Sequence, residues 1–343
     1  MDPILEVKNL TTTFHTSNGK VQAVRDVSFS LAEKEILGIV GESGSGKSVT
    51  SLSLIRLLAP TAEISAKEIL YKGEDISRLT KKRMRRVRGK EIAMIFQDPM
   101  TSLNPLMTIG NQVAEMIRQH SRLSASKVKR RVLSLLEKVH IPEAEKRYSQ
   151  YPHELSGGMR QRVMIALALA MQPGILIADE PTTALDVTIQ DQVLKVIREL
   201  QDEFGTSIIF ITHDLAVVAE LCDRVLVMYG GQIMEDAPID ALFERPLHPY
   251  TVGLMASIPS IEQDRETKLK PIPGSPPDML NPPAGCPFAP RCSEIRQICL
   301  DSPPPFVELE ENRHSRCWLL TKEAKDLDHP FREYTDRLYK EAP

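Results

Sequence analysis

The sequence lacks long hydrophobic runs. None of its stretches reaches the roughly 18 consecutive apolar residues that a membrane-spanning helix requires. The N-terminal residues 1–6 also lack the basic start and the long apolar core of a signal peptide. We therefore expect the chain to stay in the cytoplasm and to act at a membrane only through partner proteins.

The sequence also lacks an excess of charge of one sign. It carries 43 Lys and Arg residues against 46 Asp and Glu residues, for a formal net charge of -3. Nucleic-acid-binding proteins usually show a strong basic excess, so the composition argues against that class. Hydrophobic residues make up 42% of the 343 residues, which is enough for a sizeable core. A chain of this length favours about two domains.

Cysteine is scarce, and four of the five cysteines fall close together near the C-terminus. Cys222 stands alone, whereas Cys286, Cys292, Cys299 and Cys317 are separated by five, six and seventeen residues. In a reducing cytoplasm such a group is more typical of a metal site than of two disulfides. Four thiolates can bind zinc or an iron–sulfur cluster, although the spacing is not the paired C-x-x-C of many zinc sites. Buried cysteines without a ligand are a third alternative.

Proline is concentrated in the same region, with eleven of the 25 prolines between Pro271 and Pro305. Because proline fixes φ and cannot donate to a strand ladder, we expect no long helix and no central strand there. A bound metal would cross-link a segment that has little regular structure of its own.

Short apolar runs predict the strands of a parallel sheet. They span residues 36–40, 175–178, 208–211 and 225–228. A helical pattern over residues 187–204 separates the second run from the third, which gives a β–α–β order with helices flanking the sheet. Residues 4–40 contain further β-favouring stretches, and apolar residues at helical spacing predict a helix-rich region between residues 112 and 140.

A glycine-rich loop follows the first of these runs. Residues 41–48 fit the pattern G-x-x-x-x-G-K-[ST], and a helical pattern begins at Lys47. The glycines allow a tight turn whose amide groups face a phosphate, and the helix start adds its positive dipole end. Lys47 can reach the β- and γ-phosphates of ATP, and the Ser48 hydroxyl can bind Mg²⁺. The candidate phosphate-binding residues are Gly41, Ser43, Gly44, Ser45, Gly46, Lys47 and Ser48.

Two acidic residues, Asp179 and Glu180, end the second apolar run. Ligands of such sheets bind at the carboxyl ends of the strands. We predict that Asp179 holds Mg²⁺, directly or through water, and that Glu180 orients and polarises the attacking water. Phosphoryl transfer depends mainly on positioning and charge neutralisation of this kind.

The stretch Leu155–Gln161, with the sequence LSGGMRQ, carries the signature motif of ABC ATPases. Together with the phosphate loop and the acid pair, it makes residues 4 to 240 resemble that family. The resemblance implies a P-loop ABC core of the α/β class: a mainly parallel sheet, N-terminal antiparallel strands and a helical subdomain. It also implies a head-to-tail dimer in which Ser156, Gly157 and Gly158 of one subunit close over ATP bound by the other.

Other residues match motif positions of the same family. The resemblance implies that Gln97 senses Mg²⁺ and the membrane partner, and that His213 contacts the γ-phosphate. It implies that Asp186 links the two sites across the dimer, and that Phe14 stacks on the adenine ring. The family more often has tyrosine at this last position, but stacking needs only the aromatic face.

Several longer stretches resemble the ATPases of oligopeptide and dipeptide importers. They are residues 97–105, 180–188, 248–251, 274–278 and 285–292. This resemblance implies a second, related ATPase as partner, two transmembrane permeases and an external peptide-binding protein. It favours a 4Fe–4S cluster over zinc at the four cysteines. Some relatives transport nickel or other solutes. The resemblance therefore defines the type of transporter better than the solute that it transports.

We therefore predict an ABC nucleotide-binding domain over residues 1–240, with a helical subdomain at about 98–165. A proline- and cysteine-rich extension would follow over residues 241–343. The predicted function is the ATP-hydrolysing motor of a peptide importer at the cytoplasmic face of the membrane. The alternative is a soluble ABC ATPase acting on nucleic acid or the ribosome, favoured by seven basic residues among residues 81–90.

Overall fold

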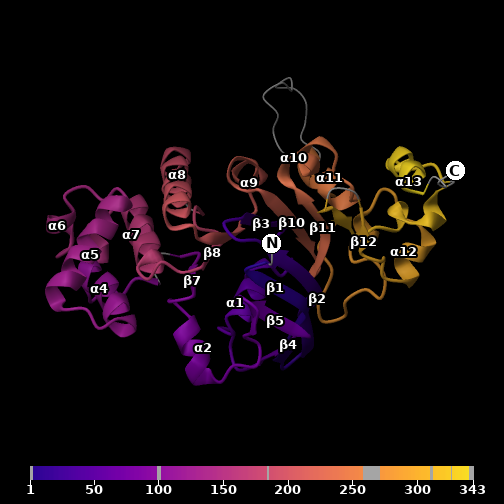
Figure 1. The fold of residues 1–343 in the computed structure, drawn as a ribbon. Helices are drawn as coiled ribbons and strands as arrows, with labels where there is room; N and C mark the ends of the chain where they lie inside the picture. The colour runs from indigo at the N-terminus through magenta and orange to yellow at the C-terminus, as the bar shows by residue number, and fades with distance from the viewer. Residues whose placement is uncertain are drawn as a thin grey trace. The chain divides into compact units, whose positions relative to one another are not determined.

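The computed structural model describes residues 3–98, 102–183, 185–257, 271–309, 312–325 and 327–339. Figure 1 shows its helices and strands with their labels. The chain divides into two compact units, and each is assembled from segments that lie far apart in the sequence. The first unit comprises residues 1–6, 30–36 and 69–211, and the second comprises residues 7–29, 37–68 and 212–343.

The first unit contains three adjacent parallel strands, β7 (Ile92–Ile95), β8 (Ile175–Asp179) and β9 (Ser207–Ile211). Every residue of β8 and β9 is buried, as expected for strands covered on both faces. Helix α8 (Val187–Phe204) connects β8 to β9. The predicted β–α–β order is therefore confirmed. The same unit holds the antiparallel pair β5 (Glu68–Tyr71) and β6 (Glu74–Asp75), followed by α2 (Lys81–Val87).

A group of helices lies between β7 and β8 in the chain. They are α4 (Ile109–His120), α5 (Ala125–Lys138), α6 (Ala144–Arg147) and α7 (Gly157–Leu169). Helices α4 and α5 contact each other and both contact α7, and Figure 1 shows the group together in magenta. The apolar face predicted for α5 is buried at Val128, Val132, Leu135 and Leu136. None of the helices in the described residues is long and apolar enough to cross a membrane.

The second unit contains antiparallel strands from the N-terminal part of the chain. Strand β1 (Leu5–Thr16) lies beside β2 (Gly19–Leu31) and pairs with β4 (Ala62–Ser65). Five further strands of this unit are neighbours in the order β3 (Ile36–Val40), β10 (Arg224–Tyr229), β11 (Gln232–Pro238), β13 (His314–Ser315) and β12 (Val307–Glu308). Among these five strands, β3 and β10 pair in parallel, whereas the other neighbouring pairs are antiparallel. Helices α1 (Lys47–Leu54) and α9 (Leu215–Leu221) belong to the same unit.

The C-terminal part of the second unit has short elements and its own apolar core. Its helices are α10 (Ile239–Glu244), α11 (Pro249–Ala256), α12 (Gln297–Asp301) and α13 (Arg332–Leu338). A buried cluster joins Leu247, Leu309, Cys317, Leu319, Leu320, Phe331 and Tyr334. The Arg313 guanidinium donates to the buried Glu235 carboxylate at 3.2 Å. Apolar burial and ion pairing therefore stabilise this C-terminal part.

Candidate functional site

The predicted phosphate loop connects β3 to α1. Gly41 has a φ of 149°, and a Cβ at this position would lie 2.1 Å from the carbonyl oxygen of Met228. Only glycine fits there. The loop is held from the other side by Gly231, whose amide donates to the Ser45 carbonyl at 3.0 Å. Within the described residues, the buried Ser45 hydroxyl makes no hydrogen bond. A backbone cradle with an available buried hydroxyl fits a bound phosphate.

The predicted ATP-binding lysine lies within this loop. The Lys47 ammonium donates to the carbonyl oxygens of Gly41 at 2.7 Å and Glu42 at 3.0 Å. Lys47 is 6% exposed, so its charge is held at the loop and does not extend into solvent. Ser48 is the next residue of α1, and Gly46 caps that helix with a φ of 102°. Gly46, Lys47 and Ser48 therefore lie together where the loop passes into α1.

The predicted acid pair lies at the carboxyl end of β8 in the first unit. Asp179 is the last residue of the strand and is 6% exposed. Glu180 has a φ of 47°, and its amide donates to the Ile211 carbonyl of β9 at 2.9 Å. A left-handed conformation at a non-glycine residue is strained and is often found at functional sites.

The structure brings Gln97 and Glu180 together. The Gln97 side-chain amide donates to Oε2 of Glu180 at 2.8 Å, although the residues are 83 positions apart. The Thr183 hydroxyl donates to the same oxygen at 3.0 Å. Both bonds fix the direction of the carboxylate. Thr183 was not among the predicted site residues, because no feature of its sequence position marks it.

Other predicted residues occupy helix caps or strand ends. Ser156 caps α7 by accepting from the Met159 amide at 3.3 Å, and Asp186 caps α8 by accepting from the Ile189 amide at 2.9 Å. His213 is exposed and follows β9, and Phe14 is half-buried on β1. The phosphate loop, Phe14 and His213 lie in the second unit, whereas Gln97, Ser156, Gly157, Gly158, Asp179, Glu180 and Asp186 lie in the first.

Comparisons with known proteins show which family the chain belongs to. A family model described as ABC transporter matches residues 24–183, and one described as the C-terminal region of oligopeptide/dipeptide transporters matches residues 234–299. The oligopeptide transport ATP-binding protein OppD of Bacillus subtilis is 52% identical over 95% of this chain and 92% of that protein. The dipeptide transport ATP-binding protein DppD of Lactococcus lactis is 49% identical over 94% of this chain and 93% of that protein. The chain belongs to the family of oligopeptide and dipeptide ABC transporter ATP-binding proteins.

Solved structures show the same fold for this ABC ATPase. A dimeric ATP-binding cassette in a post-hydrolysis state, bound to ADP and Pi, superimposes with a TM-score of 0.62 at 28% identity. The match covers 68% of this chain and 98% of that chain. The predicted α/β ABC fold is confirmed, and the chain is an ATPase, as the motifs predicted.

The four C-terminal cysteines of the ABC ATPase do not form a metal site. They line one cavity of about 20 Å³ together with residues such as His248 and Trp318. A cavity of that size holds about one water molecule. In the part of the chain that the structure describes, no group of three or more His, Cys, Asp or Glu side chains could hold a metal ion. The prediction of a 4Fe–4S cluster was wrong, and the zinc alternative has no site among these residues.

Burial affects the ionisation of three of the four cysteines. Desolvation raises the pKa of Cys286 to about 12 and that of Cys292 to about 11, and raises the pKa of Cys317 well above its usual value. These three thiols are therefore neutral at physiological pH. Cys317 belongs to the apolar cluster of the C-terminal part. Cys286 and Cys317 are buried, whereas Cys292 and Cys299 are partly exposed.

The native protein should resist alkylation at Cys286. With a pKa of about 12, only about 10⁻⁴ of this thiol is ionised at pH 8, and burial limits access further. We expect iodoacetamide to label native Cys286 about 1000-fold more slowly than the same residue in guanidinium, where the pKa returns to about 8.5. Mass spectrometry of peptides from quenched samples gives both rates. Labelling rates within tenfold of each other would contradict the buried, neutral thiol.

Proposed function

We propose that this chain is the ATP-hydrolysing subunit of an ABC importer for peptides. The observation that carries this proposal is the similarity to peptide transport ATP-binding proteins along nearly the whole chain, C-terminal region included. The named relatives act in oligopeptide or dipeptide transport. They favour the importer over the nucleic-acid alternative, for which the basic residues of α2 are the main support.

The proposed catalytic residues form two groups, the phosphate loop in the second unit and the residues around Glu180 in the first. Residues 41–48 bind the ATP phosphates, with Lys47 supplying the positive charge. Ser48, Gln97 and Asp179 would hold Mg²⁺, which would neutralise charge on the phosphate oxygens. Glu180 orients the attacking water, and the 2.8 Å bond from Gln97 keeps its carboxylate directed. Phosphoryl transfer gains most from such fixed positions.

The remaining roles concern the nucleotide and a second subunit. Phe14 stacks on adenine, and His213 contacts the γ-phosphate. Ser156, Gly157 and Gly158 close over ATP held by the partner ATPase, and Asp186 links the two sites. A serine cap and glycine amides at the start of α7 suit an anionic ligand, because the helix start carries a partial positive charge.

The proposed assembly contains a second, related ATPase, two permeases and an external peptide-binding protein. The chain would be bound at the cytoplasmic face of the membrane through the permeases. Residues 1–240 would form the nucleotide-binding domain, with the helical subdomain at about 98–165, and residues 241–343 the extension. The ABC transporter match at residues 24–183 and the transporter C-terminal match at residues 234–299 support this division.

Peptide uptake tests the function directly. In cells lacking this gene, uptake of a radiolabelled tripeptide should fall to background and return with the wild-type chain. Purified chain should also be tested for DNA binding at increasing salt. Uptake that does not depend on the gene, together with DNA affinity that falls steeply with salt, would reject the importer in favour of nucleic acid.

Changes near the loop after Gln97 should uncouple transport from nucleotide binding. This loop comprises residues 100–105, of which Met100 and Thr101 lie outside the described residues. The next residue, Leu106, is 85% exposed, and its amide donates to the Asn104 side chain at 2.9 Å. An exposed leucine on a fixed loop suits docking to an apolar permease surface.

We expect Leu106→Ser to reduce peptide uptake about tenfold, because burying one leucine contributes about 1.5–3 kcal/mol to an interface. Its affinity for ATP should change by less than about twofold. Leu327→Ser, at another exposed leucine, serves as the matched control. Unchanged uptake, or an equal loss of ATP affinity, would show that this loop does not couple the ATPase to the permeases.

A further inference from the structure

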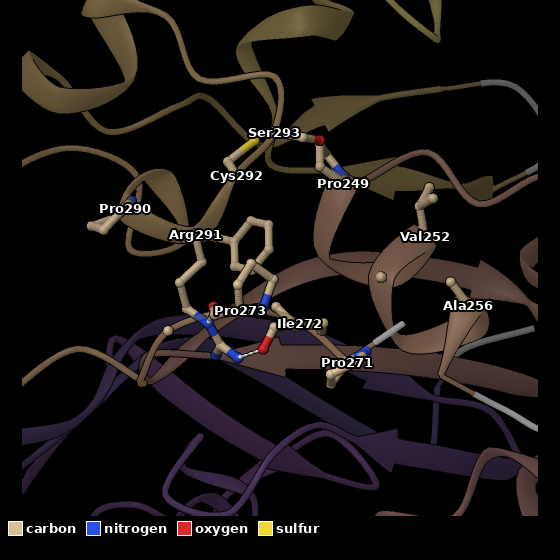
Figure 2. Close-up of a pocket in the computed structure, with 13 residues that line it drawn as sticks. Pro249, Val252, Ala256, Pro271, Ile272, Pro273, Pro290, Arg291, Cys292 and Ser293 are labelled. Atoms are coloured by element: carbon tan, nitrogen blue, oxygen red, sulfur yellow. Dashed lines mark hydrogen bonds between the residues drawn. The ribbon is translucent and has the colours of Figure 1, made fainter. Parts of the chain in front are cut away.

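Arg291 uses all of its hydrogen-bond donors within the second unit. An arginine side chain carries five N–H donors. Nε donates to the Pro273 carbonyl at 2.8 Å, and Nη2 donates to the Ile272 carbonyl at 3.1 Å, the bond visible in Figure 2. Nη1 donates to Oε2 of Glu42 at 2.6 Å and to the Tyr229 hydroxyl at 3.0 Å. Nη2 also donates to Oε1 of Glu42 at 3.0 Å.

The ion pair of Arg291 with Glu42 is bidentate and largely shielded from water. The side chain of Arg291 is 6% exposed and that of Glu42 is 25% exposed. A guanidinium fork that matches both carboxylate oxygens is among the stronger ion-pair geometries. Glu42 is the second residue of the phosphate loop. Arg291 therefore holds a carboxylate that belongs to the loop itself.

The backbone of Glu42 is held from the same region of the chain. Its amide donates to the Tyr250 hydroxyl at 2.9 Å, and Tyr250 is fully buried on α11. The Tyr250 ring packs against Tyr229 and Phe288, at centroid distances of 4.6 and 5.2 Å. Both the main chain and the side chain of Glu42 are thus fixed by residues outside the loop.

These contacts join the two parts of the chain that the family models match separately. Glu42 lies in the part matched as ABC transporter, whereas Tyr250 and Arg291 lie in the part matched as the transporter C-terminal region. A Cβ at Gly230 would lie 2.8 Å from Pro287, so the turn beside the phosphate loop also packs against the C-terminal region. The C-terminal region therefore reaches the loop that binds phosphate.

We propose that Arg291 is a positioning residue for ATP, which acts by neutralising and holding the Glu42 carboxylate of the phosphate loop. The inference rests on the proposed binding of ATP phosphates by residues 41–48. An unneutralised carboxylate in this loop repels the triphosphate. Arg291 reduces this repulsion by neutralising the carboxylate.

This role predicts an asymmetry between the two partners of the ion pair. Removing only the positive charge leaves an anion beside the phosphates, whereas removing only the negative charge leaves a cation there. A purely structural clamp would be lost equally in both cases. Affinity for a charged nucleotide therefore separates a positioning role from a structural one.

The test uses the full-length chain, Mg²⁺ and the non-hydrolysable analogue AMP-PNP, with Kd measured by calorimetry. We expect Arg291→Gln to raise Kd at least about tenfold, the effect of one unit charge at about 10 Å in partly screened surroundings. Arg291→Lys, which keeps the charge, should stay within about threefold of wild type. Glu42→Gln should bind at least as tightly as wild type. The double variant Glu42→Gln/Arg291→Gln should recover most of the lost affinity.

An unchanged Kd in Arg291→Gln overturns the proposal, and so do equal losses in the two single variants. If the melting curve shows that Arg291→Gln does not fold, the Kd values of Glu42→Gln and of the double variant are compared with that of wild type. Tenfold weaker binding of AMP-PNP by both variants would then reject the charge role of Arg291. Lys47→Ala identifies a failure of the proposed function itself. If wild type and Lys47→Ala bind AMP-PNP equally, the loop is not the phosphate site, whereas their difference confirms the site independently of Arg291.

Discussion

Replacing Glu180 with glutamine is expected to stop ATP turnover while leaving ATP binding intact. Glutamine has the same shape, and its side-chain oxygen can still accept the bonds that Gln97 and Thr183 donate to Glu180 at 2.8 and 3.0 Å. What is lost is the negative charge that orients and polarises the attacking water. Such a group contributes about 10²–10⁴-fold to rate, so we expect turnover to fall by about 1000-fold.

The measurement is ATP hydrolysis by the chain assembled with its permeases in lipid nanodiscs, alongside ATP binding by the isolated chain. Glu199→Gln is the matched control, because Glu199 is exposed on α8 and its carboxylate lies 3.4 Å from the His140 ring. It should hydrolyse ATP at close to the wild-type rate. A Glu180→Gln protein with wild-type turnover in that assembly would remove Glu180 from the catalytic role.

Local sequence patterns predicted those parts of the fold that short stretches of the chain determine by themselves. The buried strands β8 and β9 appear as apolar runs because both of their faces are covered. The phosphate loop was predictable because Gly41 and Gly46 need backbone conformations that other residues rarely adopt. In contrast, β12 and β13 have two residues each, which is too short for any periodic pattern.

Contacts between distant segments were not predictable in this way. The bond between Gln97 and Glu180 joins residues 83 positions apart, and the pair of Arg291 with Glu42 spans 249 positions. Motif resemblance named Gln97 and Glu180 as functional residues, but it did not give their contact. The resemblance of residues 285–292 to importer ATPases included Arg291 but gave it no role, because that role arises only where the C-terminal region meets the phosphate loop.

The four cysteines led to a different error. Because they lie close together in the sequence, a shared metal ligand was predicted for them. The four residues do line one cavity, but no group of three or more His, Cys, Asp or Glu side chains in the described part of the chain could hold a metal ion. A proline-rich segment was expected to need a cross-link. In the structure, an apolar core that includes Leu319, Leu320 and Phe331 follows that segment in the chain. Burial, which decides between thiol and thiolate, depends on tertiary contacts that the spacing does not contain.

Replacing Lys47 with alanine is expected to abolish ATP hydrolysis by weakening the binding of the phosphates themselves. The ammonium is held by the carbonyl oxygens of Gly41 and Glu42, so its position is set before the nucleotide arrives. Removing a preorganised donor to a charged group costs about 10²–10³-fold in rate. Because Lys47 also contributes to ground-state binding, we expect the Kd for ATP to rise by at least about tenfold as well.

This double effect distinguishes Lys47 from Glu180, whose glutamine variant should lose turnover alone. Lys20→Ala, at an exposed lysine on β2, is the matched control and should behave as wild type in both assays. Melting curves must show that Lys47→Ala is folded, because the side chain also bonds to its own loop. A folded Lys47→Ala protein that binds and hydrolyses ATP within about threefold of wild type would mean that the loop charge at the phosphates comes from another residue.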